Sequence, residues 1–236
     1  MLFRSLIFTF CFYLNTLLHV VFCSPVLVIP GRRALWAAVH SWANVSHWLL
    51  RTICGITYEI KHLDQIPHGP LLVACKHQST WETLAFTLLF DDIAIVLKRE
   101  LLFIPVIGWA MARAGNIAVA RGDGASALRG LIRQAKAAIA EGRSIVIFPE
   151  GTRVALGDQR PYQVGTAALY RQLGVPVVPM ALNSGLFWGR RQWVKRPGVI
   201  TLEILPPIEP GLSREAFMEI LRDRIESATN RLINIP

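Results

Sequence analysis

The sequence predicts an α/β fold, with a mixed, largely parallel sheet flanked by helices and preceded by an N-terminal membrane-associating helical segment. From residue 56 onward, short apolar runs typical of strands alternate with longer helical stretches, which is the pattern of a largely parallel sheet. Before them, Leu6–Ile29 is nearly all apolar and long enough to cross or deeply enter a bilayer. We therefore expect two parts, residues 1–54 and an α/β domain of residues 55–236.

Composition narrows the possible partners. The 236 residues are 53% hydrophobic and 17% charged, which is too apolar for an ordinary soluble protein and too mixed for one with many membrane spans. The net charge of +9 favours negatively charged partners, either nucleic acid or an anionic membrane surface, and the apolar content favours the membrane. The four cysteines form no CxxC pair and the histidines no HExxH motif, so we expect no metal site and no cofactor.

The N-terminal run is interpreted as an uncleaved anchor. A cleavable signal peptide is the alternative, but the run is long and no A-x-A cleavage site follows it. Arg4 precedes the run while Arg32 and Arg33 follow it, so the positive charges leave the topology open.

The next stretch, Ala34–Cys54, is predicted to be a helix that ends at Gly55. Its three tryptophans, Trp36, Trp42 and Trp48, suit the lipid–water interface, but they also suit packing against the domain. The sequence leaves both possibilities open.

Seven strands and five helices are predicted after residue 55. The expected strands are Tyr58–Ile60, Leu71–Cys75, Ile93–Leu97, Ile117–Ala120, Ser144–Phe148, Val177–Leu182 and Val199–Ile204. The expected helices are Trp81–Phe90, Phe103–Arg113, Ala125–Glu141, Tyr162–Leu173 and Arg214–Leu232. Ala125–Glu141 has the clearest amphipathic pattern, and Gly142 follows it as a cap.

The first stretch that carries chemistry runs from Cys75 to Glu82. His77 is the type of side chain that best takes a proton near neutral pH, and the Glu82 carboxylate could fix its tautomer. Five positions on a helix turn through about 140°, so we expect His77 to lie before the helix, where the chain can bend back toward Glu82. Ser79-Thr-Trp-Glu82 also fits a capping box, which leaves both roles of Glu82 open. No serine or cysteine is clearly placed as a nucleophile, so His77 would activate a substrate hydroxyl directly.

Cations follow three other predicted strands, at Lys98, Arg121 and Arg153. Ligands of open α/β sheets bind at the carboxyl ends of strands, and arginine offers a planar fork for phosphate or carboxylate. Together with His77, these residues predict a pocket that holds an anion beside a general base. The alternative at Glu150 and Arg153 is a surface turn with an ion pair.

A second basic cluster, Trp188–Arg196, interleaves arginine and lysine with tryptophan. It could meet nucleic acid, anionic lipid headgroups or an acidic protein, or it could be a solvated loop. The neighbouring anchor favours headgroups over nucleic acid.

Four blocks resemble, in order and spacing, the four motifs of the glycerolipid acyltransferases: His77-x4-Glu82, Gly115–Arg121, Phe148–Arg153 and Val175–Met180. The resemblance covers roughly residues 55–210. It departs at Glu82, where the family usually has Asp, and at Ala118 and Ala120, which leave more space before Arg121.

The resemblance implies a role for each matching residue. His77 would be the general base and Glu82 would orient it. The acceptor phosphate would be held by Arg121 and Arg153, with Lys98 as a third cation. The remaining substrate contacts would come from Glu150, Gly151 and Thr152 on the acceptor side and from Pro179 on the donor side.

The implied reaction is acyl transfer from acyl-CoA or acyl carrier protein to the sn-2 hydroxyl of lysophosphatidate (1-acylglycerol 3-phosphate), giving phosphatidate for phospholipid synthesis without an acyl-enzyme. The implied location is the inner (cell) membrane, with the catalytic domain on the cytoplasmic side and no nucleic acid as partner. The alternatives are another acceptor, namely glycerol 3-phosphate, a lysophospholipid or a lyso-ornithine lipid, or a non-catalytic membrane-binding member.

Overall fold

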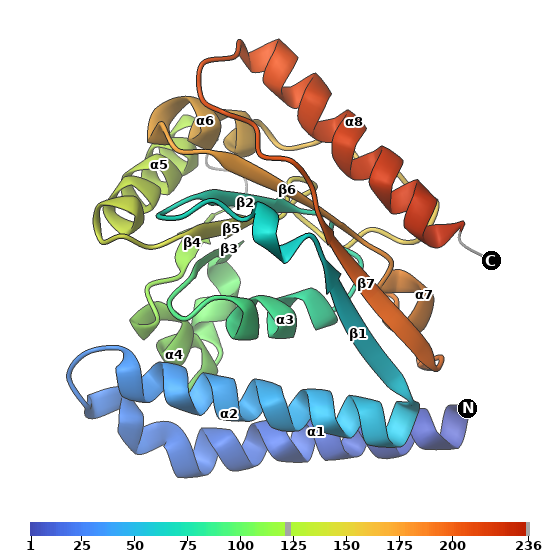
Figure 1. The fold of residues 1–236 in the computed structure, drawn as a ribbon. Coiled ribbons are helices and arrows are strands. Elements are labelled where there is room, and N and C mark those ends of the chain that lie inside the picture. The colour runs from blue at the N-terminus through green and yellow to red at the C-terminus, as the bar shows by residue number, and fades with distance from the viewer. Residues whose placement is uncertain (121–123, 235–236) are drawn as a thin grey trace.

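The computed structural model describes residues 1–120 and 124–234 (Figure 1). Its centre is a seven-stranded sheet in the order β1-β7-β6-β2-β5-β3-β4. β7 is antiparallel to β6, and the other neighbouring strands are parallel, which confirms the mixed, largely parallel sheet. The strands are β1 (Ile56–Lys61), β2 (Leu72–Cys75), β3 (Ala94–Lys98), β4 (Ile117–Val119), β5 (Ile145–Ile147), β6 (Val177–Leu182) and β7 (Gly198–Ile204).

Helices cover both faces of this sheet. They are α1 (Leu2–Cys23), α2 (Arg33–Leu49), α3 (Trp81–Leu89), α4 (Ile107–Arg113), α5 (Gly124–Ala140), α6 (Val164–Leu173), α7 (Gly185–Trp188) and α8 (Arg214–Ile233). Short helical turns join them at η1 (Ser24–Val28), η2 (Leu50–Cys54), η3 (Leu63–Gln65) and η4 (Arg99–Phe103). The predicted helices are all present, and α7 is the one that the sequence did not predict.

The hydrophobic core lies in two layers, one on each face of the sheet. In the central strand β2, Val73 and Cys75 pack toward α2 and α3, whereas Leu72 and Ala74 pack toward α5, α6 and α8. Figure 1 shows the same arrangement, with α3 and the N-terminal helices below the sheet and α5, α6 and α8 above it. Because side chains alternate along a strand, a strand covered on both faces must be apolar throughout. This is why β2 reads as an unbroken apolar run.

α1 and α2 form a hairpin across the base of the molecule (Figure 1). Polar side chains are hidden between the two helices. The Asn15 amide donates to Ser46 Oγ at 3.0 Å and to the carbonyl of Trp42 at 3.2 Å. At the start of α1, the backbone N–H of Lys195 donates to Ser5 Oγ at 2.9 Å, which ties the helix to the domain. The few polar residues of the apolar run therefore point inward.

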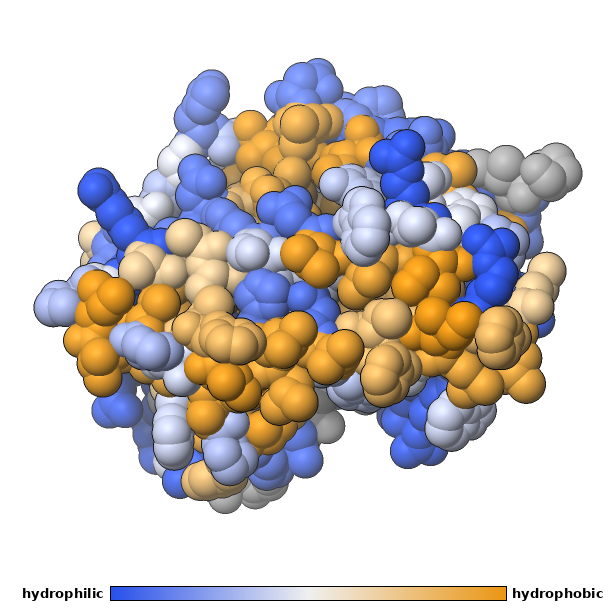
Figure 2. Space-filling view, turned by 90° about the horizontal axis from the view of Figure 1, so that it is seen from below, coloured by the Kyte–Doolittle hydropathy of each residue, from blue (hydrophilic) through white to orange (hydrophobic). Residues whose placement is uncertain are grey.

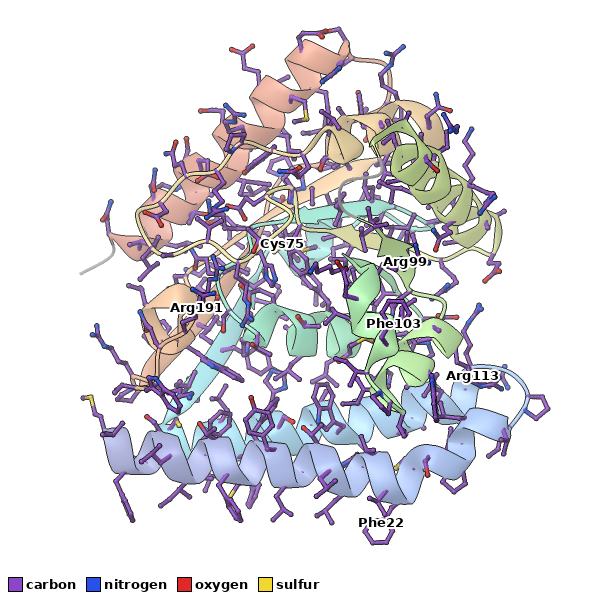
Figure 3. All side chains as sticks on the ribbon, turned by 180° about the vertical axis from the view of Figure 1, so that it is seen from behind. Phe22, Cys75, Arg99, Phe103, Arg113 and Arg191 are labelled. Atoms are coloured by element: carbon purple, nitrogen blue, oxygen red, sulfur yellow. The ribbon has the colours of Figure 1, made fainter. Side chains whose placement is uncertain are left out.

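The opposite side of α1 is apolar and exposed. Phe3, Phe10 and Phe22 expose 75%, 68% and 74% of their surface. Figure 3 shows Phe22 pointing away from the protein body. In Figure 2, which looks at this face from below, apolar side chains extend across the molecule with hydrophilic ones among them and along the edges. The segment Leu2–Val28 is long and apolar enough to cross a membrane, which supports membrane association.

The tryptophans of α2 differ in their exposure, so packing against the domain and exposure to the surroundings both occur. Trp36 is buried and its indole N–H donates to Asp92 Oδ1 at 3.0 Å, whereas Trp48 is 61% exposed. The helical stretch ends at Gly55, as predicted. Gly55 has a left-handed φ of 67°.

A polar cluster around Asp92 joins the turn of the hairpin to the domain. Its carboxylate accepts from Arg32 at 3.0 Å and from Arg143 at 2.8 Å, in addition to Trp36. Arg143 is 4% exposed and also donates to the carbonyl of Ala114 at 2.6 Å. One aspartate therefore links α2, the end of α4 and the turn before β5.

Candidate active site

The turn between β2 and α3 carries His77 and Glu82. β2 ends at Cys75 and α3 begins at Trp81, so His77 lies before the helix as expected. The C-terminal part of α2 packs on this turn, because the ring of His47 lies 6.1 Å from that of Trp81. The membrane-facing hairpin and the candidate catalytic turn are therefore direct neighbours.

His77 is held as a neutral imidazole. Its ring stacks on Phe148 with centroids 3.9 Å apart. Burial, and secondarily the positive charge of Arg153, lower the pKa of His77 to about 3. Its Nδ1 lies 4.0 Å from Glu82 Oε1 and has no hydrogen-bond partner among the described residues. A neutral imidazole is the form that can accept a proton.

Glu82 is fully buried, and its carboxylate accepts hydrogen bonds from several donors. Its Oε1 accepts from the backbone N–H groups of Gln78 at 2.7 Å and Ser79 at 2.9 Å, and from the Ser184 hydroxyl at 2.9 Å. Burial outweighs these hydrogen bonds and raises the pKa of Glu82 to about 7.

The capping box expected from Ser79 to Glu82 is formed in part. Glu82 reaches back to the Ser79 N–H, and Ser79 Oγ accepts from the N–H of Trp81 at 3.2 Å. The cap position is Thr80 instead of Ser79, so Glu82 is the second helical residue and not the third. A carboxylate can cap α3 and still face His77, so the two roles do not exclude each other.

Glu150 faces the protein interior. Its side chain has no exposed surface, and Oε1 lies 2.6 Å from Lys76 Nζ. Oε2 accepts from the backbone N–H of His77 at 3.1 Å. The resemblance implied a contact with substrate, whereas in this geometry the carboxylate of Glu150 holds the turn between β2 and α3.

Arg153 provides an exposed cation beside this turn. Its guanidinium donates to Thr80 Oγ1 at 2.9 Å, and its carbonyl accepts from Arg190 at 2.9 Å. The backbone N–H of Val154 donates to the carbonyl of His77 at 2.8 Å, which fastens the two loops together. A base and an arginine thus share one site, next to a second arginine.

The rest of the Glu150–Arg153 turn is compact. Gly151 has a left-handed φ of 66°, which strains most other residues, and Thr152 is half-buried. Both lie between Glu150 and Arg153, whose side chains contact the turn between β2 and α3.

The other predicted residues are more dispersed. Lys98 ends β3, two strands from β2, and its Nζ lies 3.1 Å from Glu100. Pro179 is buried within β6 opposite Ala74 of β2, not at the open end of the strand. Arg121 lies outside the described residues. Because β2 to β6 are parallel, their carboxyl ends share one edge, as expected for a site built from strand ends.

The Trp188–Arg196 cluster divides into two sides. Trp188 packs on Phe8 of α1 with centroids 5.3 Å apart, and Lys195 is buried with its Nζ 3.0 Å from Thr9 Oγ1. Trp193 is 71% exposed, and Arg191 is also exposed. The loop therefore clamps α1 while presenting an aromatic and a basic side chain outward.

A family model described as Acyltransferase matches residues 57–183, which is more than half of the chain. The chain belongs to the acyltransferase family. Its site is accordingly that of an enzyme of acyl transfer.

Individual relatives agree with this assignment. A 1-acyl-sn-glycerol-3-phosphate acyltransferase of Pseudomonas aeruginosa is 40% identical over 185 residues, covering 78% of this chain and 71% of that protein. One of Cocos nucifera is 28% identical over 186 residues, and the match covers 60% of its length. The crystal structure of the 1-acyl-sn-glycerophosphate (LPA) acyltransferase PlsC of Thermotoga maritima matches 100% of this chain and 99% of that one, with a TM-score of 0.80 at 20% identity. That likeness shows a common fold.

Several residues of this acyltransferase site were not found from the sequence. Lys76, which is buried, forms an ion pair with the partly buried Glu226, and Ser184 reaches Glu82 from just beyond the end of β6. Lys76 directly precedes His77, which was the one available signal. Glu226 and Ser184 carry no motif, and Glu226 also lies beyond the matched segment.

Proposed function

We propose that the protein transfers a fatty acyl group from acyl-CoA or acyl carrier protein to the sn-2 hydroxyl of 1-acylglycerol 3-phosphate, forming phosphatidate for phospholipid synthesis. The names of its relatives support this acceptor. The observation that carries the proposal is the neutral ring of His77 next to the exposed guanidinium of Arg153. A phosphorylated alcohol needs both a base for its hydroxyl and a cation for its phosphate.

In the proposed mechanism, Nδ1 of His77 faces Glu82 and Nε2 takes the proton of the acceptor hydroxyl. The oxygen attacks the thioester carbonyl and the carbon–sulfur bond breaks. His77 then gives its proton to the departing sulfur, so the donor leaves as a free thiol. No acyl-enzyme is needed. Burial of the two candidate nucleophiles that stand two positions from His77 in the sequence supports direct transfer. Cys75 and Ser79 are both 0% exposed, and burial raises the pKa of the Cys75 thiol well above its usual value.

Acceptor binding would also strengthen the base. The charge of Arg153 contributes to the low pKa of His77. A bound phosphate would offset that charge, so the pKa of His77 should rise when the acceptor arrives. The phosphate contacts proposed here are Arg153 and Arg121, with Lys98 as a third cation, while Gly151, Thr152 and Pro179 shape the acceptor and donor sides.

The location proposed is the inner (cell) membrane, with residues 1–54 as the membrane-associating part and residues 55–236 as the catalytic domain on the cytoplasmic side. The exposed apolar face of α1 and the buried polar side that ties it to Ser46 and Lys195 support insertion of the hairpin from one side. The net charge of +9 suits an anionic membrane surface.

The test is to incubate the purified protein with labelled acyl-CoA or acyl carrier protein and a panel of acceptors: lysophosphatidate, glycerol 3-phosphate, a lysophospholipid and a lyso-ornithine lipid. We expect phosphatidate from lysophosphatidate, and we expect His77→Ala to lower turnover by at least about a hundredfold, as loss of a general base does. His68→Ala, at an exposed histidine, is the matched control and should keep full turnover. A preference for another acceptor, or undiminished product from His77→Ala, would contradict the proposal.

A further inference from the structure

A buried ionic cluster connects the C-terminal helix α8 to the catalytic turn. Lys76 is 3% exposed, and its Nζ lies 2.8 Å from each carboxylate oxygen of Glu226 on α8. The same Nζ lies 2.6 Å from Glu150 Oε1. The Tyr162 hydroxyl donates to Glu226 Oε1 at 2.9 Å. One ammonium group therefore joins two carboxylates that come from different parts of the fold.

The cluster reaches His77 through the other oxygen of Glu150. That oxygen accepts the backbone N–H of His77 at 3.1 Å. The chain of contacts runs from Glu226 to Lys76, then to Glu150, and from there to the backbone that carries the imidazole. Lys76 also directly precedes His77, and its backbone N–H donates to the carbonyl of Met180 at 3.0 Å, so the backbone is held at both residues.

The charges in the cluster depend on one another. A lysine that is almost completely buried is costly unless it is paired, and removal of one partner leaves the other charge uncompensated. Glu150 has only Lys76 as a cationic partner within this cluster. If Glu226 is lost, Lys76 keeps Glu150 as a partner but loses the contact that fixes its ammonium from the side of α8, so Glu150, and with it the backbone N–H of His77, can shift.

Glu226 also borders the surface. A groove of about 630 Å³ beside α8 is lined by Glu226, Arg222, Glu219 and Asp223 of this helix and by Gln159, among others. The guanidinium of Arg222 lies over the ring of Tyr162, 5.6 Å from its centroid. Glu226 therefore lies between the buried Lys76 and this groove. Its helix, α8, lies beyond the segment matched by the family model.

We propose that Lys76 and Glu226 are positioning residues for His77, with α8 setting the position of the general base through Lys76 and Glu150. The proposal rests on the proposed function of His77. A displaced base slows the chemical step more than it weakens acceptor binding, because even a shift of about 1 Å can cost roughly a hundredfold in rate.

The experiment measures Glu226→Gln, Lys76→Met and the double variant of these two. The control is Glu219→Gln, which changes a neighbouring acid on α8 that forms no ion pair with Lys76 among the described residues. Turnover and KM for lysophosphatidate are measured together with the thermal midpoint and the amide hydrogen exchange of residues 76–80. We expect Glu226→Gln to lower kcat roughly 10- to 100-fold with KM changed less than about threefold, and to speed exchange of the turn. The double variant should be no slower than Lys76→Met alone, because the two residues act in series.

Two results would overturn the proposal: kcat and exchange for Glu226→Gln equal to those of Glu219→Gln, or losses that multiply in the double variant. If Lys76→Met does not fold, Glu226→Gln and Tyr162→Phe still decide the matter through the exchange of the turn. Failure of the proposed function is distinguishable, because wild type would then form no phosphatidate while the exchange difference could still be measured.

Discussion

At the scale of single residues, His77 and Glu82 are a pair that burial drives toward neutrality. Burial disfavours the charged form of each group, so the pKa of His77 falls to about 3 and that of Glu82 rises to about 7. Between these two values both side chains are neutral in the empty site. In this range of pH the pair therefore differs from a carboxylate–imidazolium ion pair.

This pair predicts how stability depends on pH. Between about pH 4.5 and 6.5 the folded protein keeps a proton on Glu82 that the unfolded chain has lost, which lowers stability as pH rises. Over the same range the unfolded chain binds a proton on His77 that the folded protein does not, which raises stability as pH rises. The two contributions oppose each other. Glu82→Gln removes the first, so its free energy of unfolding should rise with pH relative to wild type, by at most about 1.4 kcal/mol per pH unit.

Denaturant unfolding at several pH values from 4.5 to 6.5 measures this difference. Glu219→Gln, an unrelated carboxylate on α8, should run parallel to wild type. Parallel curves for Glu82→Gln would show that Glu82 does not hold the extra proton. Because glutamine can keep part of the cap, turnover should fall by a larger factor than the loss of stability explains.

Sequence reasoning found the residues whose chemistry is local. His77, Glu82 and Arg153 stand in short blocks whose order along the chain already indicated a base, a carboxylate and a cation. Ser184 and Glu226 could not be found this way, because they come into contact with the turn only through the fold.

At the scale of elements, α1 shows how little polarity is needed to orient an apolar helix. Leu6–Ile29 predicted a helix, but an almost uniformly apolar run does not reveal which side faces outward. Ser5 and Asn15 decide this, because each is buried and hydrogen-bonded to a partner outside α1. A buried polar group must be paired, so the side that carries these residues has to face the protein.

Three phenylalanines on opposite sides of α1 test this orientation. Phe10 and Phe22 are exposed, whereas Phe8 is 1% exposed beside Trp188. The double change Phe10→Ser and Phe22→Ser should lower the partition coefficient onto anionic vesicles by at least about a hundredfold, since each loses membrane burial of about 1.5–3 kcal/mol. The thermal midpoint should not change.

Phe8→Ser is the counterpart and should lower stability by about 3–5 kcal/mol, as the loss of a buried aromatic ring does. Vesicle co-sedimentation and thermal unfolding are measured on both proteins. A common loss of stability in the two variants would show that the exposed face of α1 is packed against protein.

Element boundaries were harder to predict where proline intervenes. The helix expected from Phe103 begins at Ile107, because Pro105 disfavours a helical conformation in Ile104, which is extended with φ −71° and ψ 118°. Residues 99–103 form the separate turn η4. The strand runs were predicted to within two residues at each end.

At the scale of the whole molecule, Asp92 fixes the hairpin relative to the sheet. Its carboxylate connects Arg32 and Trp36 of the hairpin with Arg143 of the domain. In Figure 3, Arg113 lies next to the turn between α1 and α2, where it donates to the carbonyl of Gly31 at 3.3 Å. These contacts fix the hairpin at a defined position against the domain.

Asp92→Ala should therefore affect a membrane-bound acceptor more than a dispersed one. We expect turnover on lysophosphatidate in vesicles to fall several-fold more than turnover on a short-chain analogue below its critical micelle concentration. The loss of charge-assisted hydrogen bonds should also reduce stability by about 2–3 kcal/mol. Rates on the two acceptors, measured at a temperature where the variant stays folded, provide the comparison.

Asp91→Ala, at the exposed neighbouring aspartate, is the control and should behave like wild type. An equal loss on both acceptors for Asp92→Ala would mean that the cluster supports folding alone.

The sheet order is the part of the fold that sequence patterns could not predict. Periodicity and composition report on neighbours within one segment. The antiparallel entry of β7 and the pairing of β1 with β7 depend on strands that are far apart in the chain. The same holds for the pairing of Lys76 with Glu226.

The position of β1 has a consequence for the order of events during synthesis. β1 lies at the edge of the sheet and pairs with β7 over six positions, from Ile56–Gly198 to Lys61–Glu203. The ribosome makes these two strands about 140 residues apart, which takes on the order of ten seconds. During that interval the apolar hairpin has left the ribosome while its neighbouring strand still lacks a partner. We therefore expect α1 and α2 to reach the bilayer first, so that the catalytic domain completes its folding while already held at the membrane.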